Sequence, residues 1–356
     1  MRIALDATYS LGPALSGVGV YSARLIETLT AGAPESQFLL CYRANRFFRS
    51  LLSPPPAPNT KRHLLEERLS LRWPRSVSLF HGLNQRLPRI RFARAVTTFH
   101  DLFVMTGEYS TPEFRQRFTA LARDAAARAD HILAVSRYTA HQVEQLLGVE
   151  ASRITVVHHG VDPVPEVSAP DLAAFRRRYR IERPFLLHVG AIQARKNILR
   201  LVEACEALDP EFDLVLAGSD GYGAAEIRAR IAAGPARSRT RVLGYVTRPV
   251  IERLYRTASA LAFPSLDEGF GLPVLEAMSA GLPVVTSNRS APAEVAGEAA
   301  LLVDPTDTAA IAAALRRVLA DEALRHDLIR KGQERAAQFS WTRAAAETLD
   351  VYRRLL

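Results

Sequence analysis

Short apolar segments alternate with amphipathic segments along nearly the whole chain of 356 residues, and this alternation constrains the fold more than any other feature. The apolar segments, several of which end in Gly, Asp, His or Ser, predict strands at residues 2–7, 37–42, 77–82, 95–101, 131–136, 154–160, 184–190, 213–218, 241–246, 260–265, 282–287 and 300–305. The segments between them predict helices, including 19–31, 112–128 and 137–147. Such an alternation indicates parallel sheets with helices on both faces.

A proline-rich segment, VDPVPEVSAP at residues 161–170, interrupts the alternation and separates two sets of strands. The expected fold class is therefore α/β, with two Rossmann-like domains at residues 1–165 and 166–340 that face each other across a cleft. Ligands of open α/β sheets bind outside the carboxyl ends of the strands, so the residues that follow the strands are the candidates for chemistry.

The formal charge of +9 is concentrated in the first half of the chain. Between residues 43 and 94, twelve Lys or Arg are offset by only two Glu. A field of this size attracts phosphates, nucleic acid or an anionic membrane, although a chain with 43 Arg and three Lys places arginines on any solvated face. No aromatic-interleaved recognition motif accompanies the stretch, which argues against nucleic acid. The candidates for an acceptor or membrane side are Arg46, Arg49, Arg72 and Arg75.

Membrane spans, export and metal binding have no visible sequence signal. No run approaches the roughly 18 uninterrupted apolar residues of a spanning helix, and MRIALDATYS becomes polar too early for a signal peptide. We expect a cytoplasmic protein in which Cys41 and Cys205 are reduced thiols. There is neither a DxD tripeptide nor a His/Cys cluster with metal-ligand spacing, so we expect no metal site and no cofactor.

Two candidate positions follow strands of the first half. Gly17 and Gly19 precede an amphipathic segment, where N–H groups at a helix start favour an anion, but a plain tight turn explains them about as well. The third glycine of a dinucleotide fingerprint is missing, which argues against an NAD enzyme. His100 and Asp101 end the segment 95–101, where they either point into the cleft or pair with each other.

The second half carries stronger signals. Gly190 ends a strand, and Arg195 and Lys196 follow where the next helix begins, so that phosphate groups would meet both cations and the helix amides. Lys196 is one of only three lysines in the chain, which favours a specific contact over a solvated helix start.

The segment FPSLDEGFGLPVLEAMSAGLPVV, residues 263–285, carries the most specific pattern. Glu268 lies in a glycine-containing loop after a strand, and Glu276 lies about one turn into the next helix. Backbone N–H groups at this helix entry suit a diphosphate, and Glu276 can accept hydrogen bonds from a vicinal diol such as a ribose. The candidate donor-binding residues here are Glu268, Gly269, Phe270, Gly271, Leu272 and Glu276.

These residues resemble the retaining GT-B glycosyltransferases of glycosyltransferase family 4 (group 1), in its mannosyltransferase-like branch, over nearly the whole chain. The matching motifs are SGVGVY, HD at 100–101, VSRYTA, VVHHGVD, VGAIQARKN, LVLAG, LGYV, EGFGLPVLEAMSAGLPVV, APAEVAGEAALLVDP and FSWTRAAAETLDVY. The Glu-x7-Glu element with its glycines is the most specific of them. The resemblance implies that the first domain receives the acceptor, that the second binds a nucleotide sugar, and that a helix at residues 341–356 crosses back to the first domain.

The resemblance also implies roles for the second-half residues. Glu276 resembles the ribose-binding carboxylate, and Glu268 resembles the residue at the sugar hydroxyls near the reacting carbon. Arg195 and Lys196 resemble a diphosphate clamp.

In the first half, Gly17 resembles the glycine of the loop that closes over the diphosphate, and His100 resembles the histidine that lines the transferred sugar. The chain departs from the family pattern at two places. Ala191 stands where many members have Arg, and His159-Gly160 stands where many have Asn-Gly.

The implied reaction is substitution at an anomeric carbon, with retention, through an oxocarbenium-like state. Cationic side chains and helix amides can stabilise the departing diphosphate without a metal ion, and this diphosphate can act as base toward the acceptor hydroxyl. The mannosyltransferase-like branch implies GDP-mannose as donor and a glycan or lipid-linked acceptor, in polysaccharide or glycolipid assembly. Peripheral attachment to the inner face of the cytoplasmic membrane is a further expectation.

Two other functions stay open at the level of sequence. One is a GT-B nucleotide-sugar epimerase-type enzyme, which works on the donor alone and has no use for a basic acceptor face. The other is a non-catalytic sugar-nucleotide-binding homologue, which could lose His100 and Glu268, although this chain has both.

Overall fold

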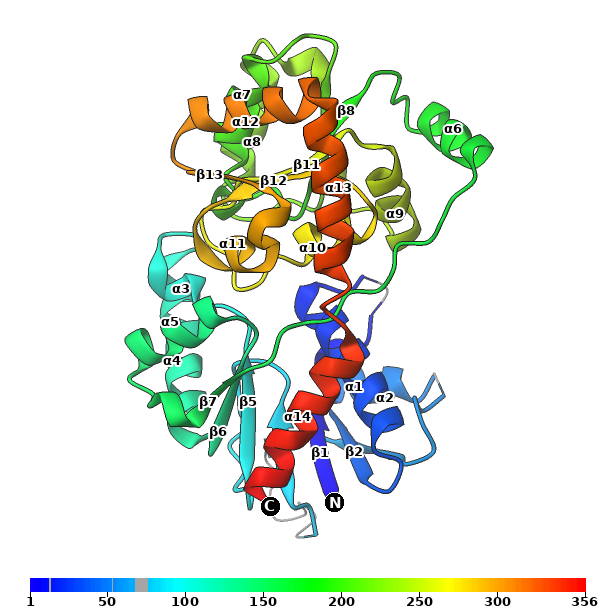
Figure 1. Ribbon diagram of the computed structural model, residues 1–356. Helices are drawn as coiled ribbons and strands as arrows, with labels where there is room; N and C mark the ends of the chain where they lie inside the picture. The colour runs from blue at the N-terminus through cyan, green and yellow to red at the C-terminus, as the bar shows by residue number, and fades with distance from the viewer. Residues whose placement is uncertain (13, 53, 68–75) are drawn as a thin grey trace. The chain divides into compact units, whose positions relative to one another are not determined.

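The computed structural model describes residues 1–12, 14–52, 54–67 and 76–356, which form two compact units (Figure 1). The first unit comprises residues 1–106, 112–160 and 339–356, and the second comprises 107–111 and 161–338. The proline-rich segment that begins at Val161 belongs to the second unit, where Arg256 donates hydrogen bonds to the carbonyls of Val164 and Pro165. The division therefore falls slightly before the boundary at residue 165 that the sequence suggested.

The described part of the first unit contains a parallel sheet with the strand order β3-β2-β1-β4-β5-β6-β7. The order reverses between β1 and β4, which makes this pair the switch point of a doubly wound fold. The strands are β1 (Arg2–Asp6), β2 (Gln37–Tyr42), β3 (Thr60–Leu64), β4 (Leu79–Gly82), β5 (Ala95–Phe99), β6 (His131–Ala134) and β7 (Ile154–Val156). The helices are α1 (Gly17–Gly32), α2 (Ala44–Ser50), α3 (Phe103–Thr106), α4 (Pro112–Arg128), α5 (Arg137–Leu147) and α14 (Trp341–Leu355).

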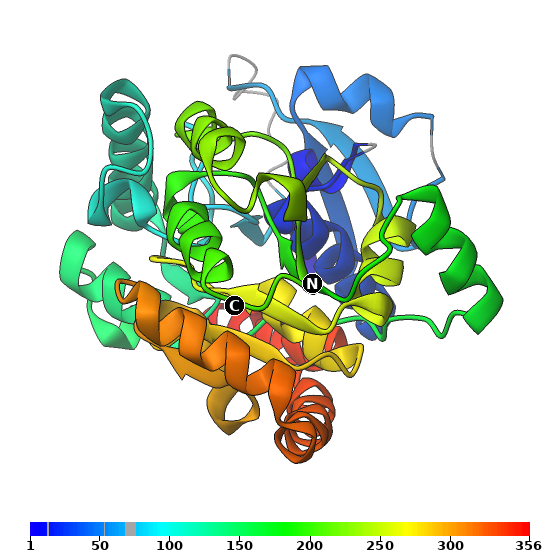
Figure 2. The same ribbon diagram turned by 90° about the horizontal axis from the view of Figure 1, so that it is seen from above.

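The second unit repeats this plan with the strand order β10-β9-β8-β11-β12-β13, and its switch point lies between β8 and β11. Its strands are β8 (Phe185–Val189), β9 (Asp213–Ala217), β10 (Thr240–Gly244), β11 (Ala260–Phe263), β12 (Val284–Ser287) and β13 (Leu301–Val303). Its helices are α6 (Ala169–Arg178), α7 (Ile198–Glu206), α8 (Ala224–Ala233), α9 (Arg248–Thr257), α10 (Leu272–Ser279), α11 (Ser290–Ala296), α12 (Thr308–Ala320) and α13 (Glu322–Ala336). Figure 2 shows α12, in orange, lying along the yellow strands of this sheet.

The predicted α/β fold is confirmed, and every predicted strand is present. The sequence analysis missed β3, because its sequence TKRHL is mostly polar, as suits a strand at the edge of a sheet. Helix α1 also begins earlier than expected. Ser16 caps it, with its Oγ accepting a hydrogen bond from the Gly19 N–H at 3.3 Å, so the helix starts at Gly17.

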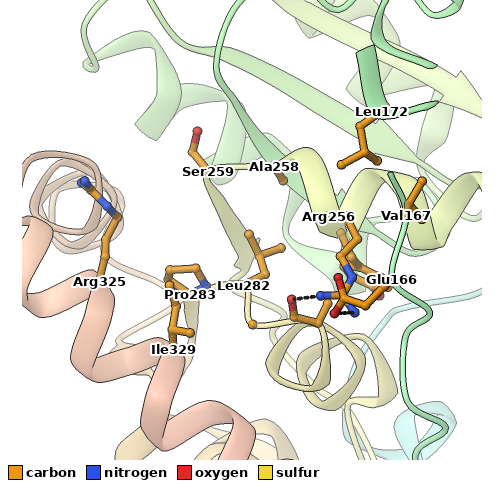
Figure 3. A pocket seen from close by; sticks show the side chains of 13 residues that line it. Glu166, Val167, Leu172, Arg256, Ala258, Ser259, Leu282, Pro283, Arg325 and Ile329 are labelled. Atoms are coloured by element: carbon orange, nitrogen blue, oxygen red, sulfur yellow. Dashed lines mark hydrogen bonds and ion pairs between the residues drawn. The ribbon is translucent and has the colours of Figure 1, made fainter. Parts of the chain in front are cut away.

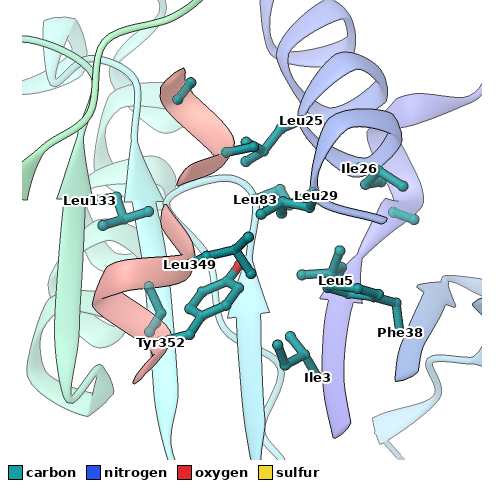
Figure 4. Close-up of a cluster of buried hydrophobic side chains, with 14 of the residues drawn as sticks. Ile3, Leu5, Leu25, Ile26, Leu29, Phe38, Leu83, Leu133, Leu349 and Tyr352 are labelled. Carbon is teal, nitrogen blue, oxygen red and sulfur yellow. The ribbon is translucent and has the colours of Figure 1, made fainter. Parts of the chain in front are cut away.

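Helix α14 supplies a large part of the core of the first unit (Figure 4). Its Leu349 and Tyr352 are buried in one cluster with residues of α1 and β1. The Tyr352 hydroxyl is hydrogen-bonded to Nδ1 of His81 at 2.6 Å, and the His81 Nε2 is hydrogen-bonded to Oγ1 of Thr98 at 2.8 Å. This helix is therefore joined to β4 and β5 by polar contacts as well as by apolar ones.

Candidate active site

The strongest cluster of predicted site residues lies at the switch point of the second sheet. Gly190 follows β8 directly, and the loop that carries Glu268 follows the neighbouring strand β11. The backbone of Gly190 has φ +148°, and a Cβ there would lie 3.4 Å from Cε of Lys196. A Cβ on Gly218 would collide with the Gly190 carbonyl. Glycines at these two positions therefore allow the strand ends and the Lys196 side chain to approach one another closely.

Lys196 and Arg195 converge on one carboxylate. The Lys196 Nζ forms an ion pair with Oε1 of Glu268, and the Arg195 Nη1 lies 3.3 Å from Oε2 of the same side chain. Arg195 also donates a hydrogen bond to the Asp267 carbonyl, and Lys196 lies over the ring of Phe263 at 4.9 Å. The two cations are each only 8% exposed, so they do not form the solvated helix start that was the alternative in the sequence.

The electrostatics of this cluster favour an anion. Burial alone would raise the pKa of the Glu268 carboxyl, but Lys196 and Arg195 outweigh it and hold that pKa below its usual value. Two cations and one carboxylate in a buried setting interact more strongly with a further anion than they would in water. The cluster can therefore bind a diphosphate.

The backbone around the cluster is fixed by local contacts. Asn197 adopts a left-handed conformation with φ 60° and donates from Nδ2 to the carbonyls of Pro264 and Pro305. The Leu266 N–H donates to the Arg195 carbonyl at 2.9 Å. These bonds hold the segment after β8 against the segment after β11, so the cations and Glu268 are positioned together.

The glycine loop leads directly into α10. Gly271 has φ +104°, a conformation that strains other residues, and α10 begins at the next residue without a side-chain cap. The Glu268 N–H donates to Oγ of Ser290 at 3.2 Å. Gly269 and Phe270 are buried in this loop, and Leu272 is partly exposed at the helix start. The uncapped start of α10 favours negative charge.

Glu276 of α10 has partners that the sequence analysis missed. Arg248 forms an ion pair with Oε1 of Glu276, and the Tyr255 hydroxyl donates to Oε2 at 2.9 Å. Both partners come from α9, seven residues apart on one face, but no sequence signal connects α9 with α10. They orient the carboxylate, whose oxygens retain further lone pairs for the hydroxyls of a diol.

His188 of β8 is a second residue that the sequence analysis missed. It is fully buried, its Nδ1 donates to the Ala262 carbonyl at 3.0 Å, and burial lowers its pKa to about 4. Within the described residues, its Nε2 has no hydrogen-bond partner, and it lies 3.5 Å from where a Cβ on Gly190 would be. A neutral acceptor nitrogen therefore lies next to Gly190.

In the first unit, His100 follows β5. Its Nε2 donates to the Leu83 carbonyl at 3.0 Å, and this bond orients the ring. Gln85 accepts from the His100 N–H and donates to the Asp101 carbonyl, and the ring packs edge-on against Tyr21 at 4.7 Å. Burial lowers the His100 pKa to about 4, so the neutral ring presents Nδ1 as an acceptor.

The remaining predicted positions lie elsewhere in the first unit. Gly17 is the exposed first residue of α1, while Arg46 and Arg49 lie on α2. Arg72 and Arg75 fall outside the described residues. In the described ranges no group of His, Cys, Asp and Glu side chains could hold a metal ion. The helices of those ranges also include none long and apolar enough to cross a membrane.

A separate cavity of about 400 Å³ opens at the opposite end of the second sheet (Figure 3). Ser259 and Pro283, which precede β11 and β12, line it together with Arg325 of α13. Arg256 forms an ion pair with Glu166 at its wall, 2.9 Å apart. This cavity lies at the amino ends of the strands and shares no residue with the cation cluster.

Two Rossmann-like units, one of which carries a buried cation pair at its switch point, are typical of the GT-B fold class. Comparisons with known proteins identify the family. The model described as "Glycosyltransferase Family 4" matches residues 16–164, and "Glycosyl transferases group 1" matches residues 173–335. O-antigen chain mannosyltransferase B of Escherichia coli is 32% identical over an alignment of 378 positions, which covers 98% of this chain and 99% of that protein. The chain belongs to glycosyltransferase family 4 and is a glycosyltransferase.

Solved structures agree on the fold. Sucrose-phosphate synthase from Thermosynechococcus elongatus matches with a TM-score of 0.80 at 22% identity, covering 99% of this chain and 98% of that one. Anabaena Alr3699/HepE, in complex with UDP and glucose, matches with a TM-score of 0.79 at 18% identity, covering 99% of this chain and 100% of that one.

Proposed function

We propose that this glycosyltransferase moves mannose from GDP-mannose to a hydroxyl of a glycan or lipid-linked acceptor in polysaccharide assembly. The observation that carries the proposal is the match, along both whole chains, to an O-antigen chain mannosyltransferase. The buried pair of Arg195 and Lys196 supports the nucleotide diphosphate part of the donor.

In this proposal the second unit binds the donor and the first receives the acceptor. The diphosphate lies at Gly190, at the two cations and at the start of α10, and Glu276 accepts hydrogen bonds from the ribose. His100 and Gly17, in the first unit, border the transferred sugar and the diphosphate. Glu268 accepts hydrogen bonds from the sugar hydroxyls once a diphosphate takes over its contacts with the cations.

The bond from the anomeric carbon to the diphosphate oxygen breaks, and a bond from that carbon to the acceptor oxygen forms. Arg195 and Lys196 stabilise the charge that develops on the departing diphosphate. The acceptor proton passes to a phosphate oxygen of that leaving group, so the nucleoside diphosphate departs with it. Attack from the face that the leaving group vacates retains the anomeric configuration.

We propose that Arg195 and Lys196 stabilise the leaving group without a metal ion, so that turnover is independent of metal ions. Transfer from GDP-mannose should continue in excess EDTA at its original rate. Loss of transfer that Mg²⁺ or Mn²⁺ restores would contradict this part of the proposal.

We further propose that the enzyme works at the inner face of the cytoplasmic membrane, held there by the basic stretch of the first unit. Arg46 and Arg49 are described members of this stretch, and Arg72 and Arg75 are its other candidates. A basic residue near an anionic surface contributes about 1 kcal/mol, so a few of them give reversible attachment.

The donor is tested by thermal unfolding with GDP, UDP, ADP or inorganic phosphate at equal concentrations. A ligand of the native state raises stability by RT ln(1 + [L]/Kd), so GDP should give the largest shift. Transfer from GDP-mannose and UDP-glucose is then measured with the same protein. A larger shift and faster transfer with the uridine compounds would overturn the proposed donor and leave the glycosyltransferase assignment intact.

A further inference from the structure

Helix α2 and the residues that follow it expose three large apolar side chains to solvent. Phe48 is 70% exposed, Leu51 is 54% exposed and Leu52 is 85% exposed. All three fall within five consecutive positions of the sequence, so they form a local cluster, which we call the α2 apolar tip. Exposed apolar side chains are common singly, but a cluster of this kind marks an interaction surface.

The α2 apolar tip is mounted on a well-anchored element. Phe47, next to the tip, packs against the core of the first unit, and its ring meets that of Phe48 edge-on at 5.8 Å. Ser50 is buried and donates a hydrogen bond to the Phe47 carbonyl at 2.6 Å. Helix α2 packs on β2 and β3 at the side of the first unit (Figure 1). One face of α2 thus packs against the first unit, and the α2 apolar tip lies on the exposed face.

The sequence around the α2 apolar tip carries charged residues of one sign only. Arg46 and Arg49 lie on the same helix, and no Asp or Glu occurs between residues 36 and 65. Protein interfaces bury apolar centres from which charge is depleted, whereas interfacial membrane segments combine Phe and Leu with Arg. The mixture at α2 favours an anionic bilayer over a protein partner.

We propose that Phe48, Leu51 and Leu52 insert into the interfacial layer of an anionic bilayer while Arg46 and Arg49 contact the lipid headgroups. This inference rests on the membrane attachment proposed above and adds an apolar component to it. Electrostatic attachment weakens with salt, because the Debye length falls to about 3 Å at 1 M, whereas apolar insertion does not. Binding should therefore have a salt-sensitive part and a salt-resistant part.

The test is sedimentation of the full chain with phosphatidylglycerol–phosphatidylcholine vesicles and with pure phosphatidylcholine vesicles, at 0.1 M and about 1 M NaCl. The wild type should bind the anionic vesicles and keep part of this binding at high salt. The triple variant Phe48→Ser, Leu51→Ser, Leu52→Ser should lose the salt-resistant part and bind at least tenfold more weakly at low salt. Arg49→Glu should weaken binding at low salt alone. Arg46 is left unchanged because its guanidinium lies close to Gly12.

Matched controls and a second readout keep the test decisive. Tyr222→Ser and Leu302→Ser remove exposed apolar side chains of the second unit, 43% and 42% exposed, and should leave binding unchanged. Phe48→Trp should shift its fluorescence to the blue on anionic vesicles, which reports burial of that position even if the triple variant folds poorly. GDP binding by each variant checks that the donor site is intact.

The contrary results point to different failures. If the triple variant binds like the wild type and the Phe48→Trp emission does not move, insertion is wrong and the attachment is purely electrostatic. If the wild type binds neither vesicle, both membrane proposals fall, while transfer to a soluble acceptor would leave the glycosyltransferase assignment standing. If the wild type is dimeric and the triple variant monomeric, with no vesicle binding by either, the tip is an interface between copies instead.

Discussion

In the described structure, Glu268 forms ion pairs with the same two cations that the proposed diphosphate would contact. Its carboxylate pairs with both Lys196 and Arg195, and all three side chains are buried. A bound diphosphate would have to compete with this carboxylate for the cations. Binding and transfer should therefore respond in opposite directions when Glu268 is changed.

Glu268→Gln should bind GDP more tightly than the wild type, by about tenfold, because an amide competes for the cations far less than a carboxylate does. Transfer should fall strongly, since the group that would contact the sugar loses its charge. Calorimetric titration with GDP and a transfer assay separate the two effects. Weaker GDP binding by this variant would show that Glu268 supports the diphosphate site rather than competing with it.

Lys196→Met should weaken GDP binding by about tenfold or more, because it removes a charge-assisted contact worth on the order of 1.5–3 kcal/mol. Lys331→Met is the matched control, since Lys331 lies on α13 in an exposed ion pair with Asp327. The same titration measures both. Equal affinities for the two variants would remove Lys196 from the donor site.

His100→Ala should lower kcat much more than it changes the affinity for GDP, because the base and ribose would be bound by the other unit. Its neutral ring, which presents Nδ1 as an acceptor, suits a sugar hydroxyl and does not suit a cationic acid. Steady-state transfer and GDP titration are compared with His141→Ala, an exposed histidine of α5. Normal turnover of this variant would show that His100 has only a structural role, through its hydrogen bond to the Leu83 carbonyl.

At the scale of elements, the sequence was a good guide wherever a single segment carries its own pattern. The strand end at Gly190 and the loop at Glu268 could be located because apolar runs stop shortly before glycines and charged residues. Arg248 and Tyr255 could not be connected with Glu276, because the contact between α9 and α10 depends on tertiary packing. The polar edge strand β3 could not be predicted for a similar reason, because its pairing with β2, and not its own sequence pattern, makes it a strand.

Leu349→Ala on α14 should destabilise the first unit by about 2–5 kcal/mol, because it leaves a cavity in a core shared by α1, β1 and α14. Leu356→Ala, at an exposed position just beyond the same helix, should cost little. Urea unfolding followed by intrinsic fluorescence gives both values. Similar stabilities for the two variants would mean that α14 contributes little to that core.

At the scale of the whole molecule, buried neutral histidines link stability to pH in both units. Burial lowers the pKa of His81 to about 3 and those of His100 and His188 to about 4, against an ordinary value of 6.5. Between pH 6.5 and 4 the unfolded chain therefore binds protons that the folded chain does not. The free energy of unfolding should be greatest above pH 6.5 and should fall on acidification, by about 1.4 kcal/mol per pH unit for each such histidine.

Denaturant unfolding at pH 7, 6 and 5 tests this linkage. His81→Asn should flatten the pH dependence, whereas His326→Asn, at an exposed position on α13, should leave it unchanged. A wild-type stability that stays constant from pH 7 to pH 5 would show that these histidines are not held neutral.

The position of α14 also orders events in the cell. Ribosomes make this helix after all of the second unit, yet Trp341, Leu349 and Tyr352 complete the interior of the first. At about 5–20 residues per second, residues 161–338 take on the order of ten to forty seconds to synthesise. During that interval Leu25 and Leu29 of α1 lack their packing partners on α14, so apolar side chains of the first unit stay exposed. The half of the protein that is translated first therefore completes its core last.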